Sequence, residues 1–139
     1  MSDVATVLIV DDEAEILETV RRRLLVEGIH ADTCEDPLDA VSKMEDNLYA
    51  IAVCDIKMPG MSGIELLQQI KKVNPLCTVV MMTGYSSMSN VVDCLGNGAA
   101  DYFVKPFRDI DSLVEAVNHA IARIARWREA MPLGHAEVR

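Results

Sequence analysis

The chain has 139 residues, of which 50% are hydrophobic, and 22 acidic against 13 basic residues give it a formal net charge of -9. This length is typical of a single domain with its own hydrophobic core. Because binding along a nucleic-acid backbone depends on lysine and arginine, the acidic excess argues against direct binding of nucleic acid.

The start of the chain shows no targeting signal. Residues 1–10 have no basic beginning and only one short apolar run, at 7–10. We therefore expect neither a signal peptide nor a membrane span, and a cytoplasmic location. The cysteines are too widely spaced for a zinc or redox CxxC motif, and we expect them to be small buried side chains. They are Cys34, Cys54, Cys77 and Cys94.

The first half of the chain alternates short apolar runs with stretches that carry apolar residues at helical spacing. In chain order it predicts a strand at 7–10, a helix at about 16–25, a weaker strand at about 30–34, a helix at about 36–44 and a strand at 50–54. Gly28 stands where a glycine often follows the end of a helix. Asp36 and Pro37 supply the N-cap and the first-turn proline of the second helix.

The second half continues the alternation. In chain order it predicts a helix from its N-cap Ser62 to the break at Asn74 and Pro75, a strand at 78–82, a helix at about 87–96, a strand at 102–104 and a helix at about 110–131. Residues 132 onward are expected to form a frayed tail. We therefore expect one domain at 1–125, followed at 126–139 by an extension of the last helix and the tail.

Five strands that alternate with five helices predict an α/β fold with a doubly wound parallel sheet, because parallel strands need crossover helices that cover both faces. Sheets of this kind bind ligands at the carboxyl ends of their strands. The polar residues that follow the apolar runs are Asp11, Asp12, Asp55, Thr83 and Lys105.

These polar residues are expected to share one edge of the sheet. If the strand order is 2-1-3-4-5, the strands before Asp11 and Thr83 flank that of Asp55 at about 5 Å each, and Lys105, about 10 Å away, can lean across. Three carboxylates facing one lysine leave two negative charges in excess in a partly desolvated crevice. A divalent cation would remove this excess, and the all-oxygen ligand set favours Mg²⁺.

With a cation bound, Asp55 can act as a nucleophile toward a phosphoryl group. Lys105 and the cation would stabilise charge on the phosphoryl oxygens, and the Thr83 hydroxyl could bond one of them. Taken singly, each of these residues could be an ordinary cap or turn residue. Five such groups at four strand ends favour the functional interpretation.

The residues around these strand ends resemble the response-regulator receiver family of two-component signalling, over about 4–125. The matching motifs are Val10-Asp11-Asp12-Glu13, Cys54-Asp55-Ile56-Lys57-Met58-Pro59-Gly60, Met82-Thr83-Gly84-Tyr85 and Gly98-Ala99-Ala100-Asp101-Tyr102-Phe103-Val104-Lys105-Pro106-Phe107. The resemblance implies the flavodoxin-like strand order 2-1-3-4-5, with Asp55 as the phosphoacceptor. It also implies that Mg²⁺ is bound by Asp12, Asp55 and the backbone carbonyl of Lys57, with Asp11 acting through water.

Such a receiver is a signalling switch that catalyses only its own phosphorylation and dephosphorylation. The resemblance implies a sensor histidine kinase or a phosphotransfer protein as the partner. It also implies that Thr83 moves toward the phosphoryl group and that Tyr102 turns inward, which changes the surface of the fourth helix, fifth strand and fifth helix. A homodimer could form through this surface. The chain is then a stand-alone receiver or the N-terminal part of a longer regulator, for example a transcriptional one.

Three other interpretations are compatible with this fold class. A flavodoxin-like cofactor carrier would need a phosphate cradle rich in Ser, Thr and Gly after the first strand, where this chain has Asp11, Asp12 and Glu13. A phosphatase with an aspartate nucleophile would be expected to carry a second acid two residues later, where this chain has Lys57. An interaction module with a decayed site remains open, although all five polar groups are present.

The last predicted helix carries apolar residues at three- and four-residue intervals along its whole length. They are Leu113, Val117, Ala120, Ile124, Trp127 and Met131. Its early part should be core, and from about Ile124 we expect the stripe to project beyond the sheet as an exposed association surface. In the alternative arrangement, Trp127 folds back onto the domain.

Overall fold

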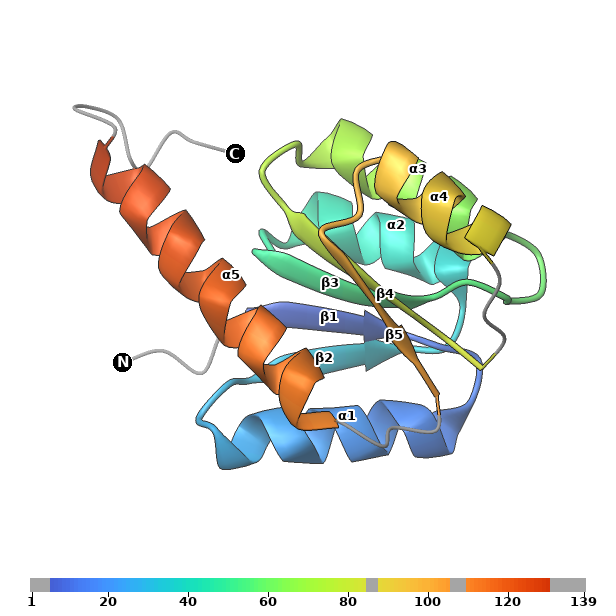
Figure 1. Cartoon of the computed structure of the whole chain (residues 1–139), viewed down its shortest axis with the longest axis horizontal. Helices are drawn as coiled ribbons and strands as arrows, with labels where there is room; N and C mark the ends of the chain where they lie inside the picture. The colour runs from blue at the N-terminus through green and yellow to red at the C-terminus, as the bar shows by residue number, and fades with distance from the viewer. Residues whose placement is uncertain (1–5, 85–87, 106–109, 131–139) are drawn as a thin grey trace.

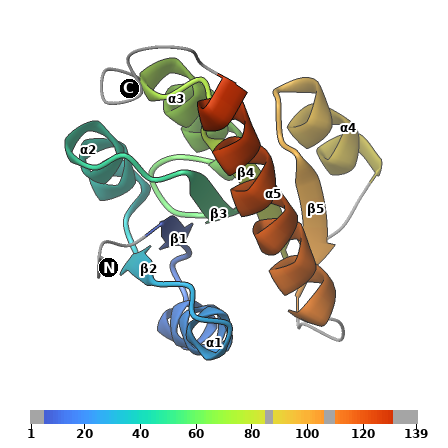
Figure 2. The same ribbon diagram turned by 90° about the vertical axis from the view of Figure 1, so that its left-hand side faces the viewer.

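The computed structural model describes residues 6–84, 88–105 and 110–130. In this part of the chain, helices cover both faces of a five-stranded sheet and form an α/β structure of three layers (Figures 1 and 2). Tyr85, Pro106, Phe107 and Met131, which belong to the quoted motifs or to the end of the last helix, lie outside the described residues.

All five strands of the sheet run parallel, in the order β2-β1-β3-β4-β5. They are β1 (Val7–Val10), β2 (Ala31–Cys34), β3 (Ile51–Asp55), β4 (Thr78–Thr83) and β5 (Asp101–Val104). The predicted fold class and strand order are therefore confirmed. β3 and β4 each end one residue later than predicted, so that Asp55 and Thr83 are the last residues of their strands.

The helices divide between the two faces of the sheet. They are α1 (Ala14–Val26), α2 (Pro37–Asp46), α3 (Gly63–Val73), α4 (Met88–Gly96) and α5 (Ile110–Ala130). Successive strand residues face opposite sides, so Val7 and Ile9 pack with α1 and α5, whereas Leu8 and Val10 pack with α2, α3 and α4. Because both faces are covered, the three central strands β1, β3 and β4 are buried along their whole length and are mainly apolar, whereas the edge strands β2 and β5 are partly exposed.

The predicted capping residues are confirmed. The Asp36 side chain accepts a hydrogen bond from the Leu38 N–H at 2.9 Å. Ser62 and Glu65 form a reciprocal capping box, with distances of 3.1 and 3.2 Å between each side chain and the other residue's N–H. Gly28 follows α1 with a φ of 80°, a conformation that glycine adopts readily. Local sequence therefore fixes where α1 ends and where α2 and α3 begin.

All four cysteines are buried free thiols, as predicted, and they lie in the core that α2, α3 and α4 share with the sheet. Burial raises the pKa of the Cys54 thiol well above its usual value. That thiol is therefore inert at neutral pH. Among the described helices, none combines the length and the apolar character needed to cross a membrane.

α5 has close to its predicted length, but the prediction that its apolar stripe leaves the core from about Ile124 is wrong. Ile124 is 6% exposed and belongs to the same core cluster as Val7 and Ile29. That core extends to the N-terminal ends of the strands, so it still covers this turn of the helix. Exposure begins beyond it: Trp127 is 39% exposed, and the Arg123 guanidinium lies 5.7 Å from the centroid of its ring.

The start of α3 lies so close to the end of β3 that only glycine fits. The Gly63 N–H donates to the Ile56 carbonyl at 2.7 Å. A Cβ at position 63 would lie 2.0 Å from the Asp55 carbonyl oxygen and 2.6 Å from the Ile56 Cα. Both neighbours are backbone atoms, so no side-chain rotation can relieve the contact. The close approach fixes the start of α3 directly behind the end of β3.

Replacing Gly63 by alanine should therefore destabilise the fold by roughly 1–3 kcal/mol, the usual cost of overpacking. Urea unfolding followed by circular dichroism measures this change. Gly96→Ala is the matched control, because Gly96 also lies in a helix and an added Cβ there would meet nothing within 4 Å. The control should be neutral or slightly stabilising. A Gly63→Ala protein as stable as the wild type would contradict the close approach.

Candidate functional site

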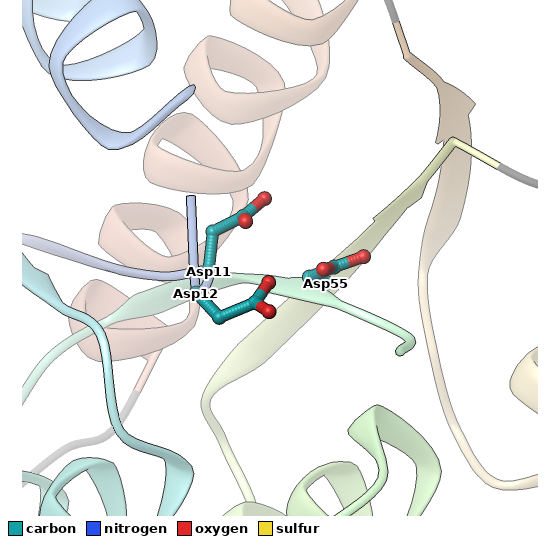
Figure 3. A group of neighbouring side chains, drawn as sticks. All are labelled: Asp11, Asp12 and Asp55. Carbon is teal, nitrogen blue, oxygen red and sulfur yellow. The ribbon is translucent and has the colours of Figure 1, made fainter. Parts of the chain in front are cut away.

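The five polar residues predicted to share one edge of the sheet come together there. Asp11 and Asp12 follow β1, Asp55 ends β3, Thr83 ends β4 and Lys105 follows β5. Because β3 lies between β1 and β4, the carboxyl ends of these strands are neighbours. Figure 3 shows the three aspartates side by side at the ends of β1 and β3.

A pocket of about 420 Å³ opens at this edge. Its walls are formed by Asp12, Glu13, Asp55, Lys57, Thr83, Gly84 and Lys105. Asp11 is 0% exposed and is linked to the pocket through its hydrogen bond with Lys105. The volume is many times the roughly 30 Å³ that one water molecule occupies in the liquid, so a small polar ligand can enter.

The three aspartates could hold a metal ion. Each offers a carboxylate oxygen, and these oxygens lie within 4.8 Å of one another. Asp11 and Asp55 are buried, whereas Asp12 is exposed. An all-oxygen donor set with open access from solvent suits a hard divalent cation that keeps some of its water.

Lys105 is the buried cation of the site, and its side chain is only 7% exposed. Its Nζ lies 2.8 Å from Asp11 Oδ2, 3.0 Å from Glu13 Oε1 and 3.6 Å from Asp55 Oδ2. The Lys105 N–H also donates to the Thr83 carbonyl at 2.6 Å, which ties the end of β5 to the end of β4. The ammonium is thus hydrogen-bonded to Asp11 and Glu13 and only approaches Asp55.

Glu13 is the residue of this group that the sequence pattern did not single out. Its N–H donates to Asp11 Oδ1 at 2.8 Å, and its side chain reaches Lys105. The sequence offered one signal for this role, because Glu13 places a third carboxylate directly after Asp11 and Asp12. The position before a predicted helix is typical of a capping residue, which hid its role.

Burial dominates the electrostatics of the two inner carboxylates. It raises the pKa of Asp55 to about 6, helped by the negative charge of Asp11 and opposed by the ammonium of Lys105. Burial likewise raises the pKa of Asp11, against the hydrogen bond from Lys105. For Lys105, burial lowers the pKa but its bonds to Asp11 and Glu13 outweigh this, and the net shift is upward. The four acids Asp11, Asp12, Glu13 and Asp55 therefore carry more negative charge than Lys105 and the exposed Lys57 balance.

Lys57 and Thr83 line the pocket beside the aspartates, whereas Tyr102 packs against the core. Lys57 is exposed, and its backbone N–H donates to the Asp55 carboxylate, which favours the ionised form. Thr83 is 1% exposed and forms part of the pocket wall. Tyr102 is half-buried against the core, and its hydroxyl is buried with no hydrogen-bond partner among the described residues. Tyr102 pairs with Met81 in the sheet and is not among the residues that form the pocket walls.

Comparisons with a family model and with individual known sequences agree on one family. A family model described as the response regulator receiver domain matches residues 7–118. The chain is 36% identical over 116 residues to the DNA-binding transcriptional regulator NtrC of Escherichia coli strain K12, covering 84% of this chain and 24% of that protein. It is 35% identical over 116 residues to the transcriptional regulatory protein ZraR of Klebsiella oxytoca, covering 84% of this chain and 26% of that protein. The chain thus spans about a quarter of the length of these relatives.

Solved structures give the same result. A CheY-like response regulator receiver domain protein from Methanospirillum hungatei JF-1 superposes with a TM-score of 0.80 at 32% identity, covering 88% of this chain and 98% of that chain. The beryllofluoride-activated NtrC4 receiver domain dimer superposes with a TM-score of 0.79 at 30% identity, covering 84% of this chain and 96% of that chain. Both likenesses extend over most of the described sheet and helices.

The buried charge of Asp55 should be measurable as a loss of stability. The Asp55 carboxyl has a pKa of about 6 when folded against a usual value of 3.8, so the folded state binds more protons between these pH values. Stability from this group is therefore lost as pH rises through that window. In metal-free buffer at pH 7.5, Asp55→Asn should be more stable than the wild type by roughly 1–3 kcal/mol in urea unfolding.

The difference should shrink as the pH is lowered toward 4, where the wild-type carboxyl is protonated as well. Asp39→Asn is the matched control, because Asp39 is an exposed acid on α2 away from the pocket. It should leave stability within about 0.5 kcal/mol of the wild type at both pH values. If Asp55→Asn gave no more stability than this control at pH 7.5, the burial penalty on Asp55 would be refuted.

Proposed function

Because this chain belongs to the response regulator receiver domain family, we propose that it is a signalling switch in which Asp55 is reversibly phosphorylated. The Asp55 side chain is 5% exposed and lines the pocket where the strands end. This placement supports the proposal most directly. A carboxylate held in one position, with a lysine beside it, is suited to in-line attack on a phosphoryl group.

In the proposed transfer, the pocket residues supply the nucleophile and stabilise the charge on the phosphoryl group. A carboxylate oxygen of Asp55 attacks the phosphorus of a phosphohistidine or a small acyl phosphate, and a new O–P bond forms. The bond from phosphorus to the leaving group breaks, and its electron pair stays with the leaving group. Lys105 stabilises the negative phosphoryl oxygens, and the Thr83 hydroxyl donates to one of them. Water later attacks the phosphorus, which releases inorganic phosphate and restores the carboxylate.

The carboxylates fit a divalent cation, which we take to be Mg²⁺. Asp11, Asp12 and Asp55 offer only oxygen atoms within 4.8 Å of one another, and hard oxygen donors suit Mg²⁺ better than zinc or copper. Asp12, Asp55 and the backbone carbonyl of Lys57 would hold it, with Asp11 acting through water. When bound, the ion supplies positive charge that balances the carboxylates and the phosphoryl oxygens.

Phosphorylation would change the surface formed by α4, β5 and α5. Thr83 ends β4 and would turn toward a phosphoryl oxygen, and Tyr102 on the adjacent β5 would move with it. The Tyr102 hydroxyl is buried without a hydrogen-bond partner among the described residues, which is unfavourable. A movement of the ring that gives this hydroxyl a partner would therefore be favoured.

The same surface carries exposed apolar side chains. Val92 and Leu95 on α4 are 59% and 49% exposed, and Val104 on β5 is 48% exposed. The similar beryllofluoride-activated NtrC4 receiver is a dimer. These features support a homodimer of this chain through α4, β5 and α5 that phosphorylation favours.

The phosphoryl donor would be a sensor histidine kinase or a phosphotransfer protein, acting in the cytoplasm. The chain would catalyse only its own phosphorylation and dephosphorylation and would not be an enzyme for another substrate. The relatives are named as transcriptional regulators, and this chain covers 24% and 26% of two of them. In a regulator of that kind, DNA binding would belong to a separate effector domain rather than to this acidic segment.

Incubation with Mg²⁺ and acetyl phosphate should add one phosphoryl group to the wild type, measured by intact mass. Asp55→Ala removes the attacking oxygen and should abolish labelling. Asp12→Ala removes a cation ligand and should lower the labelling rate by roughly tenfold or more. Asp39→Ala, an exposed acid on α2, should be labelled like the wild type. Equal labelling of Asp55→Ala and the wild type would show that Asp55 is not the acceptor.

Sedimentation velocity with and without acetyl phosphate and Mg²⁺ tests the dimer. The wild type should shift toward dimer on phosphorylation, and Leu95→Asp should weaken the association by about tenfold, since it places a charge in an apolar contact. Leu38→Asp is the control, because Leu38 is also exposed, at 58%, but lies on α2. A wild type that stays monomeric in both states would rule out this assembly.

A further inference from the structure

Glu13 occupies an unusual position at the start of α1. It is the N-cap residue of the helix, with an extended backbone at φ -101 and ψ 108, yet its side chain makes no capping hydrogen bond. The side chain instead reaches across the pocket to Lys105, which follows β5. A residue placed to cap its own helix therefore interacts with the cation of the site.

Three carboxylates surround the Lys105 ammonium, but it hydrogen-bonds to only two of them. Its Nζ is within hydrogen-bonding distance of Asp11 at 2.8 Å and Glu13 at 3.0 Å, whereas the Asp55 oxygen is 3.6 Å away. A separation of 3.6 Å is beyond that of a good hydrogen bond. Before phosphorylation, the ammonium is therefore directed at Asp11 and Glu13 rather than at Asp55.

A phosphoryl group on Asp55 would place additional negative charge where Lys105 is needed. The Lys105 Nζ now lies 3.6 Å from Asp55, so a move toward the phosphoryl oxygens would lengthen its contact with Asp11 or with Glu13. Asp11 is 0% exposed, so losing its partner would leave a buried charge uncompensated, which is strongly unfavourable. The Glu13 side chain is 62% exposed and can return to water at small cost. Glu13 is therefore the partner that can be exchanged.

We propose that Glu13 is a positioning residue that holds the Lys105 ammonium away from Asp55 until an incoming phosphoryl group displaces it. This role rests on the proposed phosphorylation of Asp55. By competing for Lys105, Glu13 slows the phosphorylation of Asp55 in the resting protein. Removing the Glu13 charge should free the ammonium for the phosphoryl oxygens. The expected gain in rate is about two- to fivefold, the effect of losing one partly exposed ion pair.

The first measurement needs no phosphorylation. The ammonium signal of Lys105 in ¹H–¹⁵N spectra reports its partners directly in the resting protein. It should shift in Glu13→Gln, which keeps the size of the side chain and removes its charge. Glu15→Gln is the matched control, because Glu15 is an exposed acid in the first turn of α1 outside the ion pairs described for Lys105. An unchanged signal in Glu13→Gln would show that the pair does not exist in solution.

The second measurement is the rate of labelling by acetyl phosphate with Mg²⁺, in both the wild type and a Lys105→Met background. Glu13→Gln should accelerate labelling two- to fivefold when Lys105 is present and have no effect when it is absent. The control Glu15→Gln should not accelerate it in either background. Raising the salt concentration should reduce the gain, because an exposed ion pair is screened.

Equal acceleration in both backgrounds would mean that Glu13 merely repels an anionic donor, and it would overturn the positioning role. No acceleration in either background would overturn it as well. A wild type that takes up no phosphoryl group would contradict the proposed function itself, and with it the effect on rate. An unchanged ammonium signal contradicts the Glu13 contact alone, so the two failures are distinguishable.

Discussion

The Lys105 ammonium is buried beside the carboxylates of Asp11 and Asp55, which lie at the carboxyl edge of the sheet. Burial raises the pKa of both acids, and one lysine does not balance them together with Glu13 at the rim. The site therefore contains an excess of negative charge that favours a divalent cation and, through it, a phosphoryl group. The same imbalance explains why Lys105 is shared among several carboxylates rather than committed to one.

The fold holds this cluster of buried charged side chains in place, although its burial is unfavourable. Parallel strands covered on both faces bring residues from four chain segments to one edge, and backbone hydrogen bonds such as that from Lys105 to Thr83 join the strand ends. Gly63 lets α3 begin directly behind Asp55, where any side chain would collide with backbone. Because the surrounding core is well buried, its stability can offset the local cost of the site.

The fold and most of the site could be predicted because each fully buried strand is an apolar run that stops at a polar residue. The run Val7–Val10, for example, stops at Asp11. Side-chain partners could not be predicted in the same way. Glu13 and Lys105 are 92 residues apart in the chain, and only the folded structure brings them together. The burial of Ile124 was mispredicted for a related reason: periodicity shows which face of α5 is apolar, whereas the length of the core beneath that face depends on the whole sheet.

The charge imbalance among the aspartates is the central claim, and locating a divalent cation in crystals tests it most directly. Mn²⁺ prefers oxygen ligands as Mg²⁺ does and is visible by anomalous scattering. Crystals grown with Mn²⁺ should show one anomalous peak in the pocket, bonded to carboxylate oxygens of Asp12 and Asp55. A pocket without a peak at saturating Mn²⁺, or a peak only at other acidic residues, would contradict the account.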